Sequence, residues 1–281
     1  MGVATSKNVH WAFFWLVSIL AFIVPATSIN SSDVFYLGSA GLILLGVIAL
    51  FVNTDPRPLT KLEKLMILTW LLYPLVTALD FWFRTGWNWS QFQEPSRFLL
   101  ALPIFLMVRR FGLSRGAMKW GVFVGAVVAG LWAFYQNQYL GITRAFGGTS
   151  SNVHVFGDIS LLLGFMSVAL FQPDWSKDWR WGCLVLVSLS LGVFGSLASG
   201  TKGGWISAPI FCWVMVDLVR HPTYAKRLMV LGITAASAIL IWKFSPFIQA
   251  RVGNIPLAVA TYFETGQVTD GSASIRLALW H

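Results

Sequence analysis

Charged residues are scarce in this sequence: Asp, Glu, Lys and Arg together make up 11% of its 281 residues. Soluble domains normally carry about 25% charged residues, whereas 56% of the residues here are hydrophobic. A water-solvated globule cannot bury that much apolar surface, so the composition excludes this class of protein. Cysteine and histidine are scarce too, with two and four residues. Their scattered positions form no disulfide framework or metal cluster, and no metal site is expected.

The apolar residues are arranged in long runs. Runs of about 18 residues or more are long enough for a helix to cross the roughly 30 Å hydrocarbon core of a bilayer. The sequence therefore predicts an all-α polytopic membrane protein of about nine transmembrane helices. These helices form one domain, 1–245, followed by an outer segment, 246–281. The predicted spans are 11–29, 34–52, 62–83, 96–108, 117–139, 153–172, 181–199, 204–219 and 227–245. The fourth span is short. We expect it to extend into the aromatic segment before it, which carries Trp82, Trp87 and Trp89.

The first apolar run follows Lys7, as the core of a secretory signal peptide would. At about 19 residues the run is longer than the usual core of about 7–15 residues. A retained first transmembrane helix is therefore the preferred interpretation.

The basic residues indicate how the helices are oriented. Cytoplasmic loops of membrane proteins are rich in Lys and Arg, and every second loop predicted here is basic. This pattern places the N-terminus in the cytoplasm and residues 246–281 outside. It also explains the net charge of +9 without a nucleic-acid partner. Thirteen of the 20 basic residues follow the rule, and the others lie on the outer side: Arg84, Arg97, Arg144, Lys202, Lys243, Arg251 and Arg276.

One of these outer cations, Arg144, begins a stretch with the features of an anion site. A glycine pair allows a tight turn, and Ser151 or Asn152 is suited to cap the next helix. The open N–H groups of a helix start beside an arginine attract anions. His154 and Asp158 lie one helical turn apart on the same face. Ionisable residues at membrane depth are functional candidates; the alternative is that these two only pair with each other.

Two further outer segments carry cations next to small residues. In Ser-Gly-Thr-Lys-Gly-Gly-Trp (199–205), Lys202 lies in a short glycine-rich turn before a helix start, which suits a phosphate. The spacing is not that of a Walker P-loop. In the segment 272–280 a serine is placed to cap a short helix with Arg276 and Trp280 on one face. The alternative to a phosphate site is that Lys202 is an exposed lysine in a tight turn and that Arg276 is a surface arginine.

At these three segments the sequence resembles the O-antigen ligase family of bacterial envelope enzymes and the related O-antigen polymerases. The stretch from Arg144 to Gly157 resembles the family's R-x-x-G loop and its hydrophobic-F-G helix start. The segment SLASGTKGGWISAP (196–209) resembles its S-G-S-R-G-G-W-L-A-x-P signature, with Lys202 where arginine is usual. The tail SASIRLALW (272–280) resembles the S-x-x-x-R-x-x-x-W start of its large periplasmic loop.

The resemblance implies a glycosyltransferase with the membrane (GT-C) fold that needs neither metal nor nucleotide. It implies transfer of a glycan from undecaprenyl pyrophosphate to a lipid A–core sugar in lipopolysaccharide biosynthesis. The reaction would take place at the periplasmic face of the bacterial inner membrane. Arg144, Lys202 and Arg276 would bind the diphosphate, because preplaced cations stabilise a leaving pyrophosphate. The family's catalytic base is a histidine later in the large loop, so we expect it beyond His281 and expect the sequence to be truncated.

Two other functions remain open at this stage. An O-antigen polymerase or another lipid-linked glycan transferase would differ in its acceptor rather than in its chemistry. A transporter of an anionic solute would carry broken helices with ionisable residues at mid-bilayer, whereas the notable charges here lie at the ends of the predicted spans.

Overall fold

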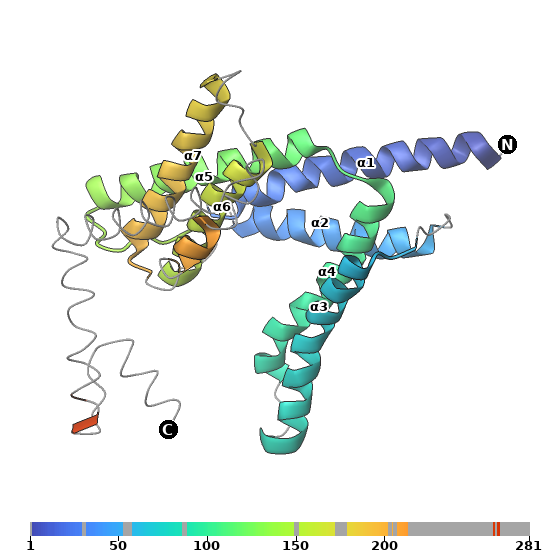
Figure 1. The fold of residues 1–281 in the computed structure, drawn as a ribbon, viewed down its shortest axis with the longest axis horizontal. Helices are drawn as coiled ribbons and strands as arrows, with labels where there is room; N and C mark the ends of the chain where they lie inside the picture. The colour runs from blue at the N-terminus through green and yellow to red at the C-terminus, as the bar shows by residue number, and fades with distance from the viewer. Residues whose placement is uncertain are drawn as a thin grey trace, which may run out of the picture. The chain divides into compact units, whose positions relative to one another are not determined.

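The computed structural model describes residues 2–29, 32–52, 58–85, 89–148, 152–171, 179–201, 204, 207–212, 261 and 263–264. Residues Met1–Thr201 form one compact unit, and Lys202–His281 form a second. The described part of the first unit is built of helices (Figure 1). They are α1 (Gly2–Thr27), α2 (Ser32–Phe51), α3 (Lys61–Asp80) with a π-helical extension η1 (Phe81–Thr85), α4 (Trp89–Phe111), α5 (Arg115–Gln138), α6 (Val153–Phe171) and α7 (Trp179–Ser199).

Six of these helices are long and apolar enough to cross a membrane, which confirms the prediction of a polytopic helical membrane protein. The six match predicted spans in order and in approximate length. Their membrane-crossing parts are Asn8–Thr27, Asp33–Phe51, Lys61–Phe83, Arg115–Gln138, Val153–Phe171 and Arg180–Ser199. The count of nine is not reached within the described residues.

The predicted fourth span, 96–108, is part of a helix but is not among those six. Helix α4 begins at Trp89, inside the aromatic segment, and continues to Phe111 as a 23-residue helix. Its first half holds Gln91, Gln93, Glu94 and Arg97, so it is more polar than the other helices. The predicted span 227–245 lies outside the described residues. Of the predicted span 204–219, the structure describes Gly204 and 207–212, which are helical.

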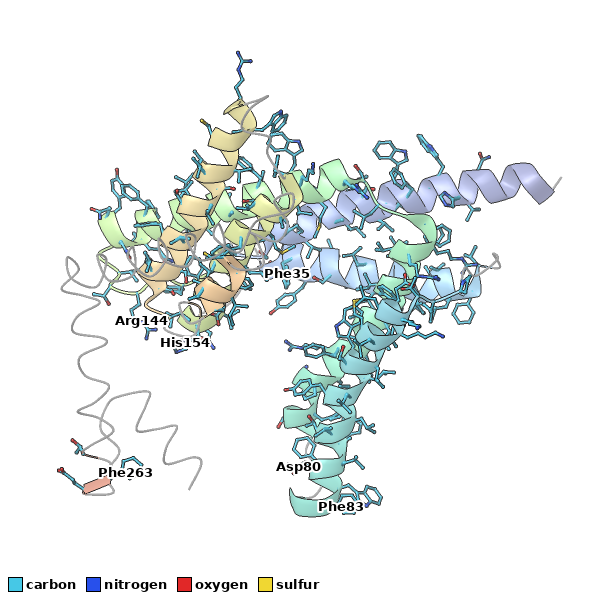
Figure 2. The ribbon with its side chains drawn as sticks, in the orientation of Figure 1. Phe35, Asp80, Phe83, Arg144, His154 and Phe263 are labelled. Atoms are coloured by element: carbon cyan, nitrogen blue, oxygen red, sulfur yellow. The ribbon has the colours of Figure 1, made fainter. Side chains whose placement is uncertain are left out.

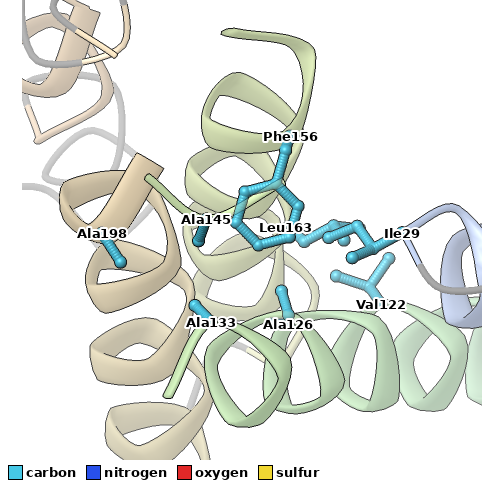
Figure 3. Packing of buried hydrophobic residues seen from close by; sticks show 9 residues of the cluster. Ile29, Val122, Ala126, Ala133, Ala145, Phe156, Leu163 and Ala198 are labelled. Atoms are coloured by element: carbon cyan, nitrogen blue, oxygen red, sulfur yellow. The ribbon is translucent and has the colours of Figure 1, made fainter. Parts of the chain in front are cut away.

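Helices α1, α5, α6 and α7 pack around one core of small and medium-sized side chains (Figure 3). Helix α5 runs parallel to α1, because Gly121 lies against Phe22 and Gly125 against Pro25. Helices α6 and α7 run antiparallel, since the two ends of α6 lie against opposite ends of α7. The buried core residues are Ile29, Val122, Ala126, Ala129, Ala133, Ala145, Phe156, Leu163 and Ala198.

Glycines set how closely these helices approach. A Cβ added to Gly130 of α5 would lie 2.5 Å from the Cβ and 2.6 Å from the carbonyl oxygen of Leu191 in α7. A Cβ added to Gly192 of α7 would lie 2.6 Å from the carbonyl oxygen of Ser160 in α6. Small residues at helix contacts are the usual means by which membrane helices gain van der Waals contact and stability.

A cluster of arginine contacts joins α2, α3 and α4 where α4 ends. Arg109 pairs with Glu63 at the start of α3, with 2.9 Å between Nε and Oε1, and also donates to the Pro58 carbonyl. Arg110 donates to the carbonyls of Ala49 and Val52, where α2 ends. The contacts of Arg110 are favourable because helix C-terminal carbonyls lack partners within their helix. These are two of the arginines that the sequence predicts to be cytoplasmic.

We expect Gly130→Ala to destabilise the protein by about 1–3 kcal/mol, because the added methyl group meets the Leu191 backbone. The matched control is Gly116→Ala in the first turn of α5, where the added Cβ meets only the Ser114 hydroxyl at 3.5 Å. Thermal unfolding of the two purified variants in the same detergent measures the difference. Equal midpoints would contradict the close approach of α5 and α7.

Candidate functional site

The ends of four helices meet where the chain passes from α5 to α6. The amide of Gly148 donates to the carbonyl of Ile29, just after α1, at 2.7 Å. The amide of Ala145 donates to the carbonyl of Ala198, near the end of α7, at 3.0 Å. The segment 139–148 therefore joins the C-terminal ends of α1, α5 and α7.

Arg144 lies in this segment and is half-buried. Its Nε donates to the carbonyl oxygen of Ser199, the last residue of α7, at 3.0 Å. The carbonyls at a helix C-terminus carry a partial negative charge, so a guanidinium is stabilised there. The contact joins the first of the sequence-predicted segments to the start of the second, across 55 positions of the sequence.

The turn after α7 is held by hydroxyl groups. Gly200 has a positive φ of 68°, as is common where a helix ends. The hydroxyls of Ser199 and Thr201 lie 2.7 Å apart, and the Thr201 hydroxyl donates to the carbonyl of Val153 in the first turn of α6 at 3.0 Å. Gly157 faces both hydroxyls, and a Cβ there would collide with them. The turn is thereby seated against the start of α6.

The start of α6 is capped by Asn152, one of the two residues that the sequence predicts for this role. The Asn152 side-chain oxygen accepts a hydrogen bond from the amide of His154 at 2.9 Å, and its carbonyl accepts one from Phe156. His154 and Asp158 are both exposed, and their charges interact. His154 directly follows Val153, whose carbonyl binds Thr201, so it lies at the same end of the unit as Arg144 (Figure 2).

Of the sequence-predicted site residues, the structure brings Arg144, His154 and Asp158 to one end of the unit Met1–Thr201. Lys202 and Arg276 lie outside the described residues, as does His281. Within the described ranges, no group of three His, Cys, Asp or Glu side chains is placed to hold a metal ion.

Sequence reasoning did not find Gln136, which is 1% exposed and bonds to the segment that carries Arg144. A signal was present, because Gln136 continues a stripe of small buried residues on one face of α5. A polar residue in such a stripe of a membrane helix needs a partner. The other members of the stripe are Val122, Ala126, Ala129 and Ala133.

No model of a known protein family matches the chain. The chain is similar to an uncharacterized protein of Haemophilus influenzae, with 24% identity over 194 residues. The similar region covers 68% of this chain and 48% of that protein, so the chain spans about half the length of the curated relative it matches. This similarity carries no function with it.

We expect Thr201→Val to lower stability by about 1–3 kcal/mol, because it removes the donor to the Val153 carbonyl while keeping the side-chain shape. Thr201 is 1% exposed, so water cannot replace the lost bond. Thr201→Ser keeps the hydroxyl and is the control. Thermal unfolding compares the two, and a Thr201→Val protein as stable as the control would show that this hydrogen bond does not hold the turn.

Proposed function

We propose that the protein is a metal-independent membrane glycosyltransferase of the O-antigen ligase type. In this proposal it moves a glycan from undecaprenyl pyrophosphate to a lipid A–core sugar at the periplasmic face of the bacterial inner membrane. The observation that carries the proposal is the bond from Arg144 Nε to the Ser199 carbonyl. Two segments that resemble separate motifs of one family are neighbours in space, as parts of a single site have to be.

The location of this junction is in keeping with a lipid-linked substrate. It lies at the ends of α1, α5, α6 and α7, each of which is long and apolar enough to cross a membrane. The distribution of basic residues assigns these ends to the outer side. A diphosphate at the membrane surface can reach a helix end there while its lipid chain stays in the bilayer.

The chemistry needs positive charge more than it needs a nucleophile from the protein. Negative charge builds on the pyrophosphate as the sugar–oxygen bond breaks, and cations fixed beforehand lower the barrier. Arg144, Lys202 and Arg276 are proposed to bind the diphosphate. Lys202 would act as a single point charge rather than as the planar fork of an arginine.

A proton must also leave the acceptor hydroxyl, which requires a general base. The resemblance implies a histidine of the large periplasmic loop for this step. His154 and Asp158 are secondary candidates for substrate contact, since both are exposed at the junction.

Transfer to a different acceptor is the second candidate function. A polymerase would use the same donor and the same cations but would extend a lipid-linked glycan. The assay separates the two by product, because a ligase joins glycan to lipid A–core and a polymerase yields longer lipid-linked glycan.

We expect Arg144→Ala to lower the rate of glycan transfer by about 10²–10³-fold in the full-length protein, the loss typical for one preorganised donor at a developing oxyanion. Arg276→Ala should have a similar effect. Transfer is measured with membranes that contain the lipid-linked glycan and a lipid A–core acceptor. Membrane insertion should be unchanged in both variants.

The control is Arg97→Ala, which removes an exposed arginine from α4. Its transfer rate should stay close to that of the unchanged protein. Wild-type transfer in an Arg144→Ala, Arg276→Ala double variant would overturn the role of these residues in binding the diphosphate.

A further inference from the structure

Gln136 stands out as the polar member of an otherwise apolar packing face. It lies in the last turn of α5, and its side chain is 1% exposed. A buried amide is stable only when its donor and acceptor groups are paired. The partner of Gln136 is therefore informative about what this position does.

Both ends of the Gln136 amide bind the backbone of a single residue. Its Oε1 accepts a hydrogen bond from the Phe146 amide at 2.9 Å. Its Nε2 donates to the Phe146 carbonyl at 2.9 Å. The pairing uses the donor and the acceptor of the amide together, and no purely apolar side chain reproduces it.

Other bonds hold the same segment in the same place. The indole N–H of Trp132, one turn earlier in α5, donates to the Phe146 carbonyl at 3.0 Å. The backbone carbonyl of Gln136 accepts from the amide of Ile142 at 3.0 Å. The segment from Ile142 to Phe146 is therefore fixed against α5 at both ends, and Gln136 contributes to both.

Arg144 lies between these two fixed points. The amide of the next residue, Ala145, donates to the carbonyl of Ala198, and Arg144 Nε donates to that of Ser199. If Phe146 leaves α5, the backbone that carries Arg144 loses one of the two surfaces that locate it. The guanidinium is then located only by the bonds to the end of α7.

We propose that Gln136 is a positioning residue, which sets the place of Arg144 by holding the Phe146 backbone from both sides. The positioning itself follows from the hydrogen bonds of the segment. Its consequence for glycan transfer rests on the proposed function. Preorganised charge is effective because it is not reoriented during the reaction, so a mobile Arg144 would bind less diphosphate and transfer glycan more slowly.

The test uses a side chain that can be switched between two hydrogen-bonding states. In Gln136→Glu the protonated carboxyl offers one donor and one acceptor, the two functions that the amide uses on Phe146, whereas the ionised form only accepts. Burial opposes ionisation, and Arg144, the one charged residue of segment 139–148, favours it. A series from about pH 5 to about pH 8 lies above the pKa of about 4.3 of a free glutamate, in the direction in which burial shifts the pKa of a carboxyl.

The first measurement is hydrogen–deuterium exchange of residues 139–148 in the full-length protein, expressed relative to the unchanged protein at each pH. We expect Gln136→Glu to lose about tenfold or more of its protection at about pH 8 and to regain most of it at about pH 5. Gln136→Met keeps a similar volume without the hydrogen bonds, so its protection should be low at every pH. Gln138→Glu, at an exposed position of the same turn, should match the unchanged protein.

The second measurement is the rate of glycan transfer over the same pH series. Gln136→Glu should regain transfer at low pH relative to the unchanged protein, and Gln136→Met should not. A role in packing alone would leave the exchange of segment 139–148 in Gln136→Met close to that of the unchanged protein, and that outcome overturns the proposal. Exchange that follows pH in a protein without any glycan transfer would leave the positioning intact and overturn the proposed function instead.

Discussion

Backbone hydrogen bonds between the segment 139–148 and the surrounding helix ends are the interaction on which this part of the structure depends. Carbonyls at the end of a helix have no partner within it, and Ile29, Ala198 and Ser199 are buried, so water does not supply one. The carbonyls of Ile29, Ala198 and Ser199 each accept a bond from this segment. The same bonds therefore complete the ends of the two flanking helices and fix the position of Arg144.

Close packing of small residues makes this arrangement possible. Gly130 and Gly192 bring α5, α6 and α7 near enough for their ends to share one segment. Gly157 lets the turn after α7 lie against α6, because it leaves room for the hydroxyls of Ser199 and Thr201. A methyl group at any of these positions would separate elements that carry the candidate site, so the packing and the proposed chemistry depend on the same glycines.

The charged groups of the described chain are arranged differently in its two clusters. Where α4 ends, Arg109 and Arg110 bind a carboxylate and the carbonyls around α2 and α3, which anchors those helices. At the junction of α5, α6 and α7, Arg144 binds a helix C-terminus beside exposed His154 and Asp158. The first cluster anchors helices to one another, whereas the second leaves two ionisable side chains exposed beside a helix end.

The sequence by itself determined that this is a helical membrane protein, the approximate limits of six helices able to cross a membrane, and Ser151 or Asn152 as the cap of α6. These features follow from local composition and spacing. Only the tertiary structure decided that Arg144 lies beside Ser199 and that Gln136 holds the segment between them, because contacts across 55 and 10 positions depend on how helices pack. The limits of α4 also needed the structure, since its polar first half and Pro103 obscure the helix in a hydropathy pattern. The roles of Lys202 and Arg276 rest on the sequence resemblance.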